Sequence, residues 1–135
     1  MAVIYAGDRL ISPKQDLSFI KHHAIFVGDI DGVPQVVENQ INVGVRLVPL
    51  DRFWAEHPEC IIESFRGQPH ERDEIVRKSL NNLGRTYKLL DYNCESFANE
   101  VQHGKSVSKQ VQNGLAAVGL TIGAIFFTKW MKNNE

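Results

Sequence analysis

The hydrophobic pattern of the chain changes at Pro69, and this change limits the fold more than any other feature of the sequence. Before Pro69, apolar residues come in short runs separated by Gly, Pro and Asp, which is typical of strands. After Pro69 the spacing becomes helical, with Ile75, Val76, Ser79, Leu80 and Leu83 recurring along one face. The sequence therefore predicts an α+β fold in which a small antiparallel sheet packs against helices.

Turn signals assign the individual strands. Residues 24–27 form a buried apolar run that ends at Gly28, and Asp31-Gly32 is a strong two-residue turn signal. A second strand follows at 35–38, so residues 22–39 are predicted to form a hairpin. Further strands are expected at 43–48 and 60–65, with a short helical turn at 50–54 between them.

A helix is predicted to begin close to Asn93. Either Asp91 or Asn93 can cap it, and it should end near His103-Gly104. Positions 94, 97, 98 and 101 share one face of such a helix, and three of them are the apolar residues Phe97, Ala98 and Val101. Cys94 is therefore expected to face inward, toward the sheet.

This position suits Cys94 to nucleophilic chemistry. The amide groups and the positive end of the helix dipole favour a thiolate at the first turn of a helix. The backbone amide of Cys94 can also donate to an oxyanion that forms on an attacked carbonyl. The simpler alternative is that Cys94 packs as a small hydrophobic residue. Cys60, inside an isoleucine-rich strand, is expected to be core only.

A base for this thiol must come from elsewhere, and His22 and His23 open the first predicted strand. Adjacent strand residues point to opposite faces, so only one of them is expected to meet the helix. Glu38 or Asn39, on the neighbouring strand of the hairpin, is placed to orient that imidazole. No role is expected for the remaining histidines, which lie in polar segments: His57, His70 and His103.

Composition excludes several other classes of function. The 135 residues suit one main domain, and a formal net charge of −1 with dispersed Lys and Arg gives no electrostatic basis for binding nucleic acid. The two cysteines and five histidines show no CxxC or HxxxH spacing, so no metal and no cofactor are expected. Without a secretory signal at the N-terminus, a reducing compartment is favoured over a Cys60–Cys94 disulfide.

The C-terminal part of the chain differs from the rest. The run from Gly114 to Phe127 carries no charge, which divides the chain into a catalytic body, residues 1–112, and a hydrophobic helix, residues 113–135. A helix from Leu115 to Met131 would be roughly 26 Å long, close to the thickness of a bilayer core. Trp130 and its neighbouring lysines suit a membrane interface. We expect a membrane anchor; a helix buried in the core or bound to a partner is the alternative.

Two segments together resemble a known family. His22-His23-Ala24-Ile25-Phe26-Val27-Gly28-Asp29 resembles the histidine box of the lecithin retinol acyltransferase-like proteins. Asn93-Cys94-Glu95-Ser96-Phe97-Ala98-Asn99-Glu100, with the segment 104–111 after it, resembles their cysteine box. Gly7-Asp8 and residues 87–90 also look like the family, so that the resemblance spans roughly residues 5 to 111.

The resemblance implies a circularly permuted, papain-like fold of the NlpC type, in which the catalytic histidine precedes the cysteine. It implies that Cys94 is the nucleophile and His22 the general base. Family members that act on phospholipids carry a second histidine on the next strand, where this chain has Glu38, with Asn39 beside it. A carboxylate can still orient His22, so the presence of Glu38 in place of the second histidine is compatible with catalysis. It does weaken the expectation that the substrate is a phospholipid.

We therefore expect a thiol acyltransferase or hydrolase that forms an acyl-cysteine on a lipid ester or other acyl donor. Its tail would hold it on the cytoplasmic side of a membrane. Two alternatives stay open: a cysteine peptidase or amidase, as in the wider superfamily, and a catalytically inactive membrane adaptor.

Overall fold

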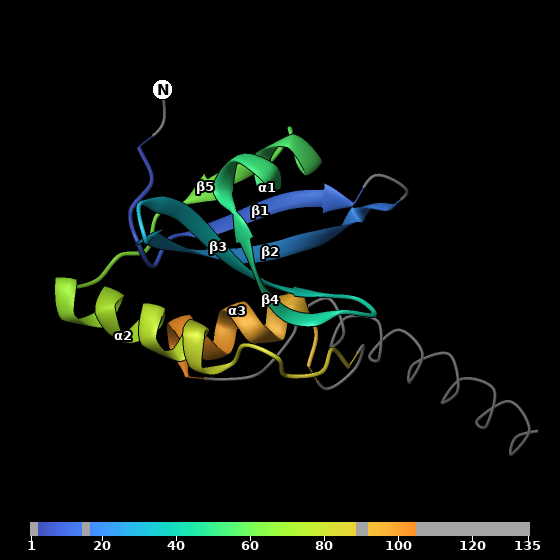
Figure 1. The fold of residues 1–135 in the computed structure, drawn as a ribbon. Helices are drawn as coiled ribbons and strands as arrows, with labels where there is room; N and C mark the ends of the chain where they lie inside the picture. The colour runs from blue at the N-terminus through green and yellow to red at the C-terminus, as the bar shows by residue number, and fades with distance from the viewer. Residues whose placement is uncertain (1–2, 15–16, 89–91, 105–135) are drawn as a thin grey trace, which may run out of the picture.

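The computed structural model describes residues 3–14, 17–88 and 92–104 (Figure 1). The elements along the chain are β1 Arg9–Lys14, β2 Leu17–Ile30, β3 Val33–Gln40, β4 Gly44–Pro49, α1 Leu50–Glu56, β5 Ile61–Glu63, α2 Pro69–Asn81 and α3 Cys94–His103. The predicted α+β class is confirmed, with strands before Pro69 and the two longer helices from Pro69 onward.

Within the described residues, the strands form one antiparallel sheet in the order β4-β3-β2-β1-β5. Strands β2 and β3 make the predicted hairpin, which extends beyond residues 22–39 at both ends. Asp31 and Gly32 both have positive φ, at 52° and 81°, as a tight turn between twisted strands requires. The hairpin matters for function because it carries both His22 and Glu38.

Strand β1 was not expected from the sequence. Its apolar content is confined to Leu10 and Ile11, and Pro13 marks a shift in its pairing with β2. The strand forms because β2 is long enough to pair along all of it, from Arg9 opposite Ile25 to Lys14 opposite Leu17. It supplies residues that the site needs, among them Arg9 and Ser12.

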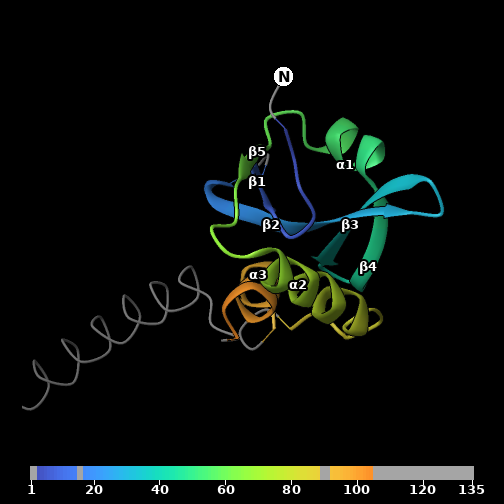
Figure 2. The same ribbon diagram turned by 90° about the vertical axis from the view of Figure 1, so that its left-hand side faces the viewer.

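Among the described residues, two helices cover one face of the sheet, and one short helix covers the other. Helices α2 and α3 lie side by side on one face, and α1 lies on the other (Figures 1 and 2). Each face has its own apolar cluster. The cluster under α2 and α3 includes Ile25, Val37, Ile75, Phe97 and Val101. The cluster under α1 includes Leu10, Phe26, Val36, Val48 and Phe53.

Asp8 ties the start of β1 to the region of α2. Its carboxylate is fully buried and accepts hydrogen bonds from the Phe65 amide at 2.8 Å and from Arg72 Nη1 at 2.7 Å. The other carboxylate oxygen accepts the Tyr5 amide at 2.9 Å. A buried carboxylate with three donors is well compensated, so Asp8 is a structural residue.

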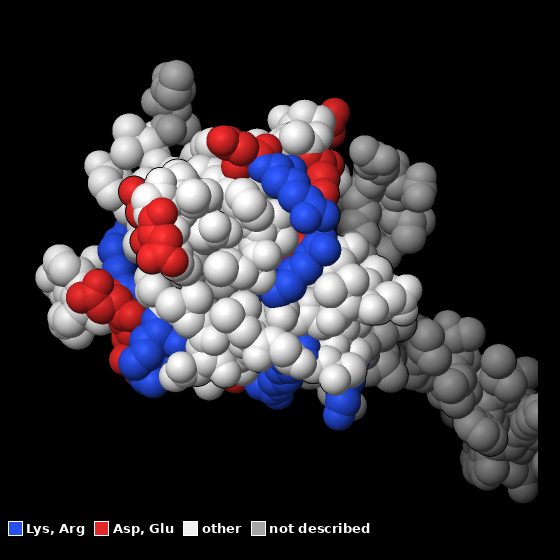
Figure 3. All heavy atoms as spheres, in the orientation of Figure 1, with Lys and Arg blue, Asp and Glu red and all other residues white. Residues whose placement is uncertain are grey.

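The predicted C-terminal helix, residues 113–135, lies outside the described residues. Within the part of the chain that the structure describes, no helix is both long and apolar enough to cross a membrane. On the face shown in Figure 3, basic and acidic side chains of the described residues are interspersed with uncharged surface.

Candidate active site

Helix α3 begins as the sequence predicts, and its cap sets the position of Cys94. Asn93 is the cap: its Oδ1 accepts the Ser96 amide at 3.0 Å, and Ser96 Oγ accepts the Asn93 amide at 2.6 Å. Cys94 is the first helical residue and only 4% exposed, with Sγ 3.7 Å from the carbonyl oxygen of Lys21. The predicted inward face is confirmed, since Phe97, Ala98 and Val101 are all buried.

His22 connects Cys94 to Glu38. It lies on β2 and is 3% exposed, and its Nε2 is 2.8 Å from Glu38 Oε1. Its side chain is also hydrogen-bonded to that of Cys94. The three side chains thus form a continuous hydrogen-bonded line, from the helix start through β2 to β3.

Each charged group in this line favours the ionised form of its neighbour. Burial alone would lower the pKa of His22, but the hydrogen bonds and charges of Cys94 and Glu38 outweigh it and raise that pKa to about 9. Burial alone would likewise raise the pKa of Glu38, and its bonds to His22 and Arg46 hold it below its ordinary value. At neutral pH the arrangement therefore favours an imidazolium on His22 beside an ionised Glu38.

Arg46 completes the line and was not predicted. It is the cross-strand partner of Glu38 on β4, and its Nε donates to Glu38 Oε2 at 2.8 Å. Each oxygen of the fully buried Glu38 carboxylate thus meets one cation. Opposite charges directly across two antiparallel strands are a recognisable signal once the strand register is known.

Asn39 has a different position. The sequence left Glu38 and Asn39 as alternatives for the group that orients the histidine, and it is Glu38 that contacts His22. Asn39 donates from Nδ2 to the carbonyl oxygen of Tyr92 at 3.0 Å. It therefore anchors the chain just before Cys94 to strand β3.

His23 is in an environment opposite to that of His22. Its Nδ1 lies 3.4 Å from Arg9 Nη1, and its Nε2 lies 3.4 Å from Glu95 Oε2 without hydrogen-bond geometry. Burial, and then the charge of Arg9, lower the pKa of His23 to about 4. The expectation that only one of the two histidines meets the helix is wrong. His23 lies beside Glu95 in the first turn of α3. His22 also contacts this helix, because its side chain is hydrogen-bonded to that of Cys94.

Arg9 was also missed by the sequence reasoning. It is buried, and its guanidinium donates to Gln102 Oε1 and to Asn99 Oδ1, both at 2.9 Å. These two acceptors are one turn apart on α3, so Arg9 joins β1 to the helix that carries Cys94. A lone arginine in a short strand gives no sequence signal for such burial.

His57 corrects a further expectation, since no role was predicted for it. It follows α1 directly, and its ring stacks on that of His22 with 5.1 Å between centroids and 26° between planes. Phe53 packs against it at 4.5 Å, and Ser12 Oγ lies 3.0 Å from its Nδ1. The site therefore includes a second histidine beside the base.

The same residues could be considered as metal ligands. Ligand atoms of His22, Glu38 and His57 all lie within 4.8 Å of one another. Imidazole lone pairs lie in the ring plane, however, and the planes of His22 and His57 are stacked at 26°. Two nearly parallel rings are poorly placed to direct in-plane lone pairs at one ion, and His22 Nε2 and both Glu38 oxygens already have hydrogen-bond partners. This arrangement therefore does not fit a preformed metal site.

The second cysteine takes no part in the line. Cys60 is half-buried against the cluster under α1, and its Sγ lies 3.7 Å from the Ile61 carbonyl oxygen. Both cysteines are free thiols, so the alternative of a Cys60–Cys94 disulfide is wrong.

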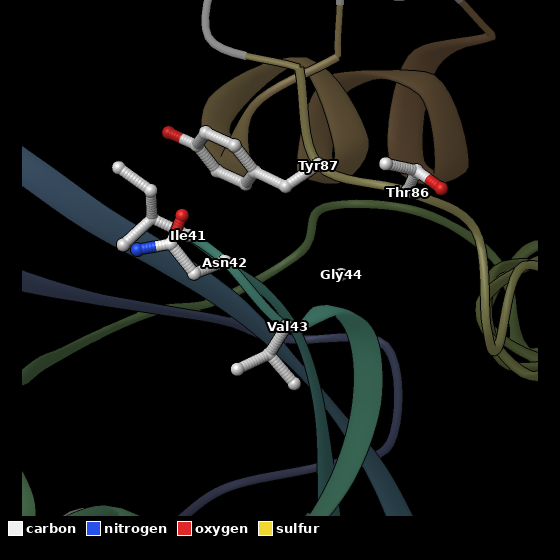
Figure 4. Close-up of a pocket in the computed structure, with 6 residues that line it drawn as sticks. All are labelled: Ile41, Asn42, Val43, Gly44, Thr86 and Tyr87. Atoms are coloured by element: carbon white, nitrogen blue, oxygen red, sulfur yellow. The ribbon is translucent and has the colours of Figure 1, made fainter.

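A pocket of about 440 Å³ opens at the end of the β3–β4 hairpin. Ile41, Asn42 and Val43 form one wall, and Thr86 and Tyr87 face them (Figure 4). Burial, and then the nearby charge of Cys94, raise the pKa of Tyr87 to about 12. Tyr87 is therefore the residue of this pocket that senses the charge of the candidate nucleophile.

Gly44 brings the two walls of this pocket together. Its φ is +92°, and a Cβ added there would lie 2.5 Å from the carbonyl oxygen of Arg85. The backbone of Arg85 and Gly84 bonds that of Val45 through two hydrogen bonds, of 2.9 and 2.8 Å. Only glycine allows this close approach without moving the chain.

Comparison with known proteins agrees with this geometry. No individual curated protein matches the chain. The family model described as lecithin retinol acyltransferase matches residues 4–107, which include the strand of His22, that of Glu38 and the helix of Cys94. Since the match covers most of the chain, the protein belongs to the lecithin retinol acyltransferase family.

Proposed function

We propose that the protein is a thiol acyltransferase or hydrolase that carries its acyl group on Cys94. Membership in the family supports an acyltransferase or thiol-hydrolase type of activity. The observation that carries the assignment of residues is the hydrogen-bonded line from Cys94 through His22 to Glu38. It supplies a nucleophile, a proton carrier and an orienting anion in the order that this chemistry requires.

In the first half-reaction, the Cys94 thiolate attacks the carbonyl carbon of an ester. A carbon–sulfur bond forms, and the carbonyl oxygen becomes an oxyanion near the Cys94 amide at the start of α3. His22 then gives its proton to the leaving alkoxide as the carbon–oxygen bond breaks. The products are an alcohol and an acyl-cysteine, with His22 neutral.

In the second half-reaction, neutral His22 acts as a base. It removes a proton from water, or from an acceptor amine or alcohol, which attacks the acyl-cysteine. The carbon–sulfur bond breaks, and the thiolate and the imidazolium are restored. Glu38 stabilises the imidazolium in both halves, and Arg46 holds Glu38 in place.

The acyl donor that suits this chain best is a lipid ester. Ile41 and Val43, which line the same pocket as Tyr87, are apolar and 43% and 58% exposed. Such side chains are suited to contact an acyl chain or a lipid surface. A membrane anchor within residues 113–135 would keep the body on the cytoplasmic side and place the donor in its plane.

Intact-mass spectrometry tests the proposal. The full chain is incubated with vesicles of mixed phospholipids, the reaction is quenched in acid, and the mass of the intact protein is measured. We expect the protein to gain the mass of one fatty-acyl group. Cys94→Ala should remove the adduct, and Cys60→Ala should keep it. An adduct that depends on Cys60 would contradict the assignment. Cleavage of peptide amides, with no lipid adduct, would favour the peptidase alternative instead.

A further inference from the structure

The side chain of His57 has no part in the line of Cys94, His22 and Glu38, yet it covers one flat face of the His22 ring. Its ring belongs to a cluster of three aromatic rings: Phe53 packs against it at 4.5 Å, His22 stacks on it at 5.1 Å, and the rings of His22 and Phe53 are 6.1 Å apart. Ser12 Oγ, at 3.0 Å from Nδ1, fixes its rotation. A half-buried histidine with three such contacts is held in a set orientation.

The hydrogen bonds of His22 do not fix its ring plane on their own. A hydrogen bond to a ring nitrogen is directed along the ring plane, so the bonds to Glu38 and Cys94 place the edge of the ring and leave its faces to be held by packing. A flat group on its face opposes tilting of the ring. His57 is such a group, and β1 anchors it through Ser12, the cross-strand partner of His22.

We propose that His57 is a positioning residue that fixes the plane of His22 and makes the thiol site sensitive to acid. The inference rests on the proposed roles of Cys94 and His22. A neutral His57 can stack on an imidazolium, because the ring face is electron-rich. A protonated His57 would place a second positive charge beside His22.

Acid then affects the reactive pair in a defined way. When His57 gains a proton, repulsion moves the proton of His22 onto the Cys94 sulfur. The thiolate and imidazolium become a thiol and a neutral imidazole, which are unreactive. Burial, and then the charge of His22, hold the pKa of His57 below its ordinary value.

Every element packed against His57 contributes to this balance. Ser12 on β1 is neutral, His22 on β2 and Arg46 on β4 disfavour its protonation, and Glu38 on β3 and Glu56 on α1 favour it. The two cations and the two carboxylates oppose each other, and burial, which is the largest cause, holds the pKa of His57 below its ordinary value.

The test measures how fast iodoacetamide alkylates Cys94 between pH 4.5 and 9.5, in the full chain carrying Cys60→Ala. His57→Phe keeps a stacked ring but cannot be protonated. We expect it to keep the neutral-pH rate within about twofold and to move the acid fall in rate about one pH unit lower. His57→Ala, which loses the stack, should lower the rate about tenfold at every pH. The alkylation rate of Ser12→Ala should lie between that of His57→Ala and that of the parent.

Controls separate this inference from the proposed function. His70→Ala, which changes an exposed histidine on α2, should match the parent. If His22→Ala does not alter the alkylation rate, the proposed function fails. If His22→Ala slows alkylation but His57→Phe matches the parent profile, only the acid sensitivity of His57 is overturned. A parent-like rate for His57→Ala overturns its positioning role.

Discussion

Glu38 Oε1 lies 2.8 Å from His22 Nε2, and both side chains are almost completely buried. A buried carboxylate is costly unless it is paired, and Arg46 supplies the second cation at 2.8 Å. The carboxylate and the imidazolium therefore depend on each other. Removing one leaves the other with an uncompensated charge in a medium of low polarity.

Replacing Glu38 by Gln should slow turnover less than removing His22. The amide keeps a hydrogen bond to His22 but loses the charge that stabilises the imidazolium. We expect kcat/KM to fall on the order of 10²-fold for Glu38→Gln and 10³- to 10⁴-fold for His22→Ala. The alkaline limb of the pH profile should also move to lower pH in Glu38→Gln, because Glu38 helps raise the pKa of His22.

Asn39 supplies the matched comparison, since it is the next residue on β3 and holds the Tyr92 carbonyl. Asn39→Ala should destabilise the segment before Cys94 without moving the pH profile. A parent-like rate for Glu38→Gln, together with a large loss for Asn39→Ala, would transfer the third role to Asn39.

The two adjacent histidines should titrate on opposite sides of the ordinary value of 6.5. The pKa of His22 is raised to about 9 and that of His23 lowered to about 4, so at pH 7 one ring is charged and its neighbour neutral. Ring-proton and ring-nitrogen NMR between pH 4 and 10 measures both. Cys94→Ser should lower the pKa of His22, because it removes the thiolate.

These shifts also fix the direction in which stability depends on pH. Because the folded pKa of His22 lies above 6.5, its stabilisation is complete below 6.5 and is lost as pH rises through about 9. His23 is the reverse: folding excludes its proton, so stability falls as pH drops from 6.5 toward 4. That loss is on the order of 3 kcal/mol, and His23→Gln should remove it in urea unfolding curves. An unchanged pH dependence in His23→Gln would contradict this assignment.

The sequence predicted the parts of the site that depend on local patterns. Asp31-Gly32 specified the β2–β3 turn, and the helical spacing of Phe97, Ala98 and Val101 specified which face of α3 is buried. Together they singled out Cys94 and the pair His22-His23 as candidates, and the resemblance to the family then favoured His22 as the base. Capping by Asn93 is also a local signal, since its partner Ser96 is three residues away.

The missed residues are those whose position depends on contacts distant in sequence. Arg9 is buried only because Asn99 and Gln102, about 90 residues away, accept its hydrogen bonds. His57 lies in a polar segment, and the sheet brings it to Ser12 and His22. Neither contact leaves a periodic pattern, so reading the chain segment by segment could not find them.

Gly44→Ala should destabilise the fold more than Gly32→Ala. Both glycines have positive φ, so each substitution incurs about 1–2 kcal/mol of backbone strain. Only at Gly44 would the new Cβ also meet backbone, the Arg85 carbonyl oxygen at 2.5 Å; nothing lies within 4 Å of it at Gly32. Thermal unfolding of the two variants separates the clash from the strain. Equal losses would show that the approach of Arg85 is not tight.

Removing residues 114–135 should release the protein from membranes while leaving the thiol site intact. The helices and strands that hold Cys94, His22 and Glu38 all end before residue 105, and the described residues of that part of the chain already form two buried apolar clusters. A bilayer-spanning helix gains its stability from lipid rather than from the domain, so its loss should spare the core. The truncated protein should therefore stay soluble and react with iodoacetamide at Cys94 at the full-length rate. Its activity toward phospholipid vesicles should fall, because it is no longer concentrated at their surface, while activity toward a short-chain, water-soluble ester should not. Flotation with vesicles measures the membrane release. Aggregation or a much lower melting temperature after truncation would mean that the apolar segment contributes to the core, and the anchor would then have to be abandoned.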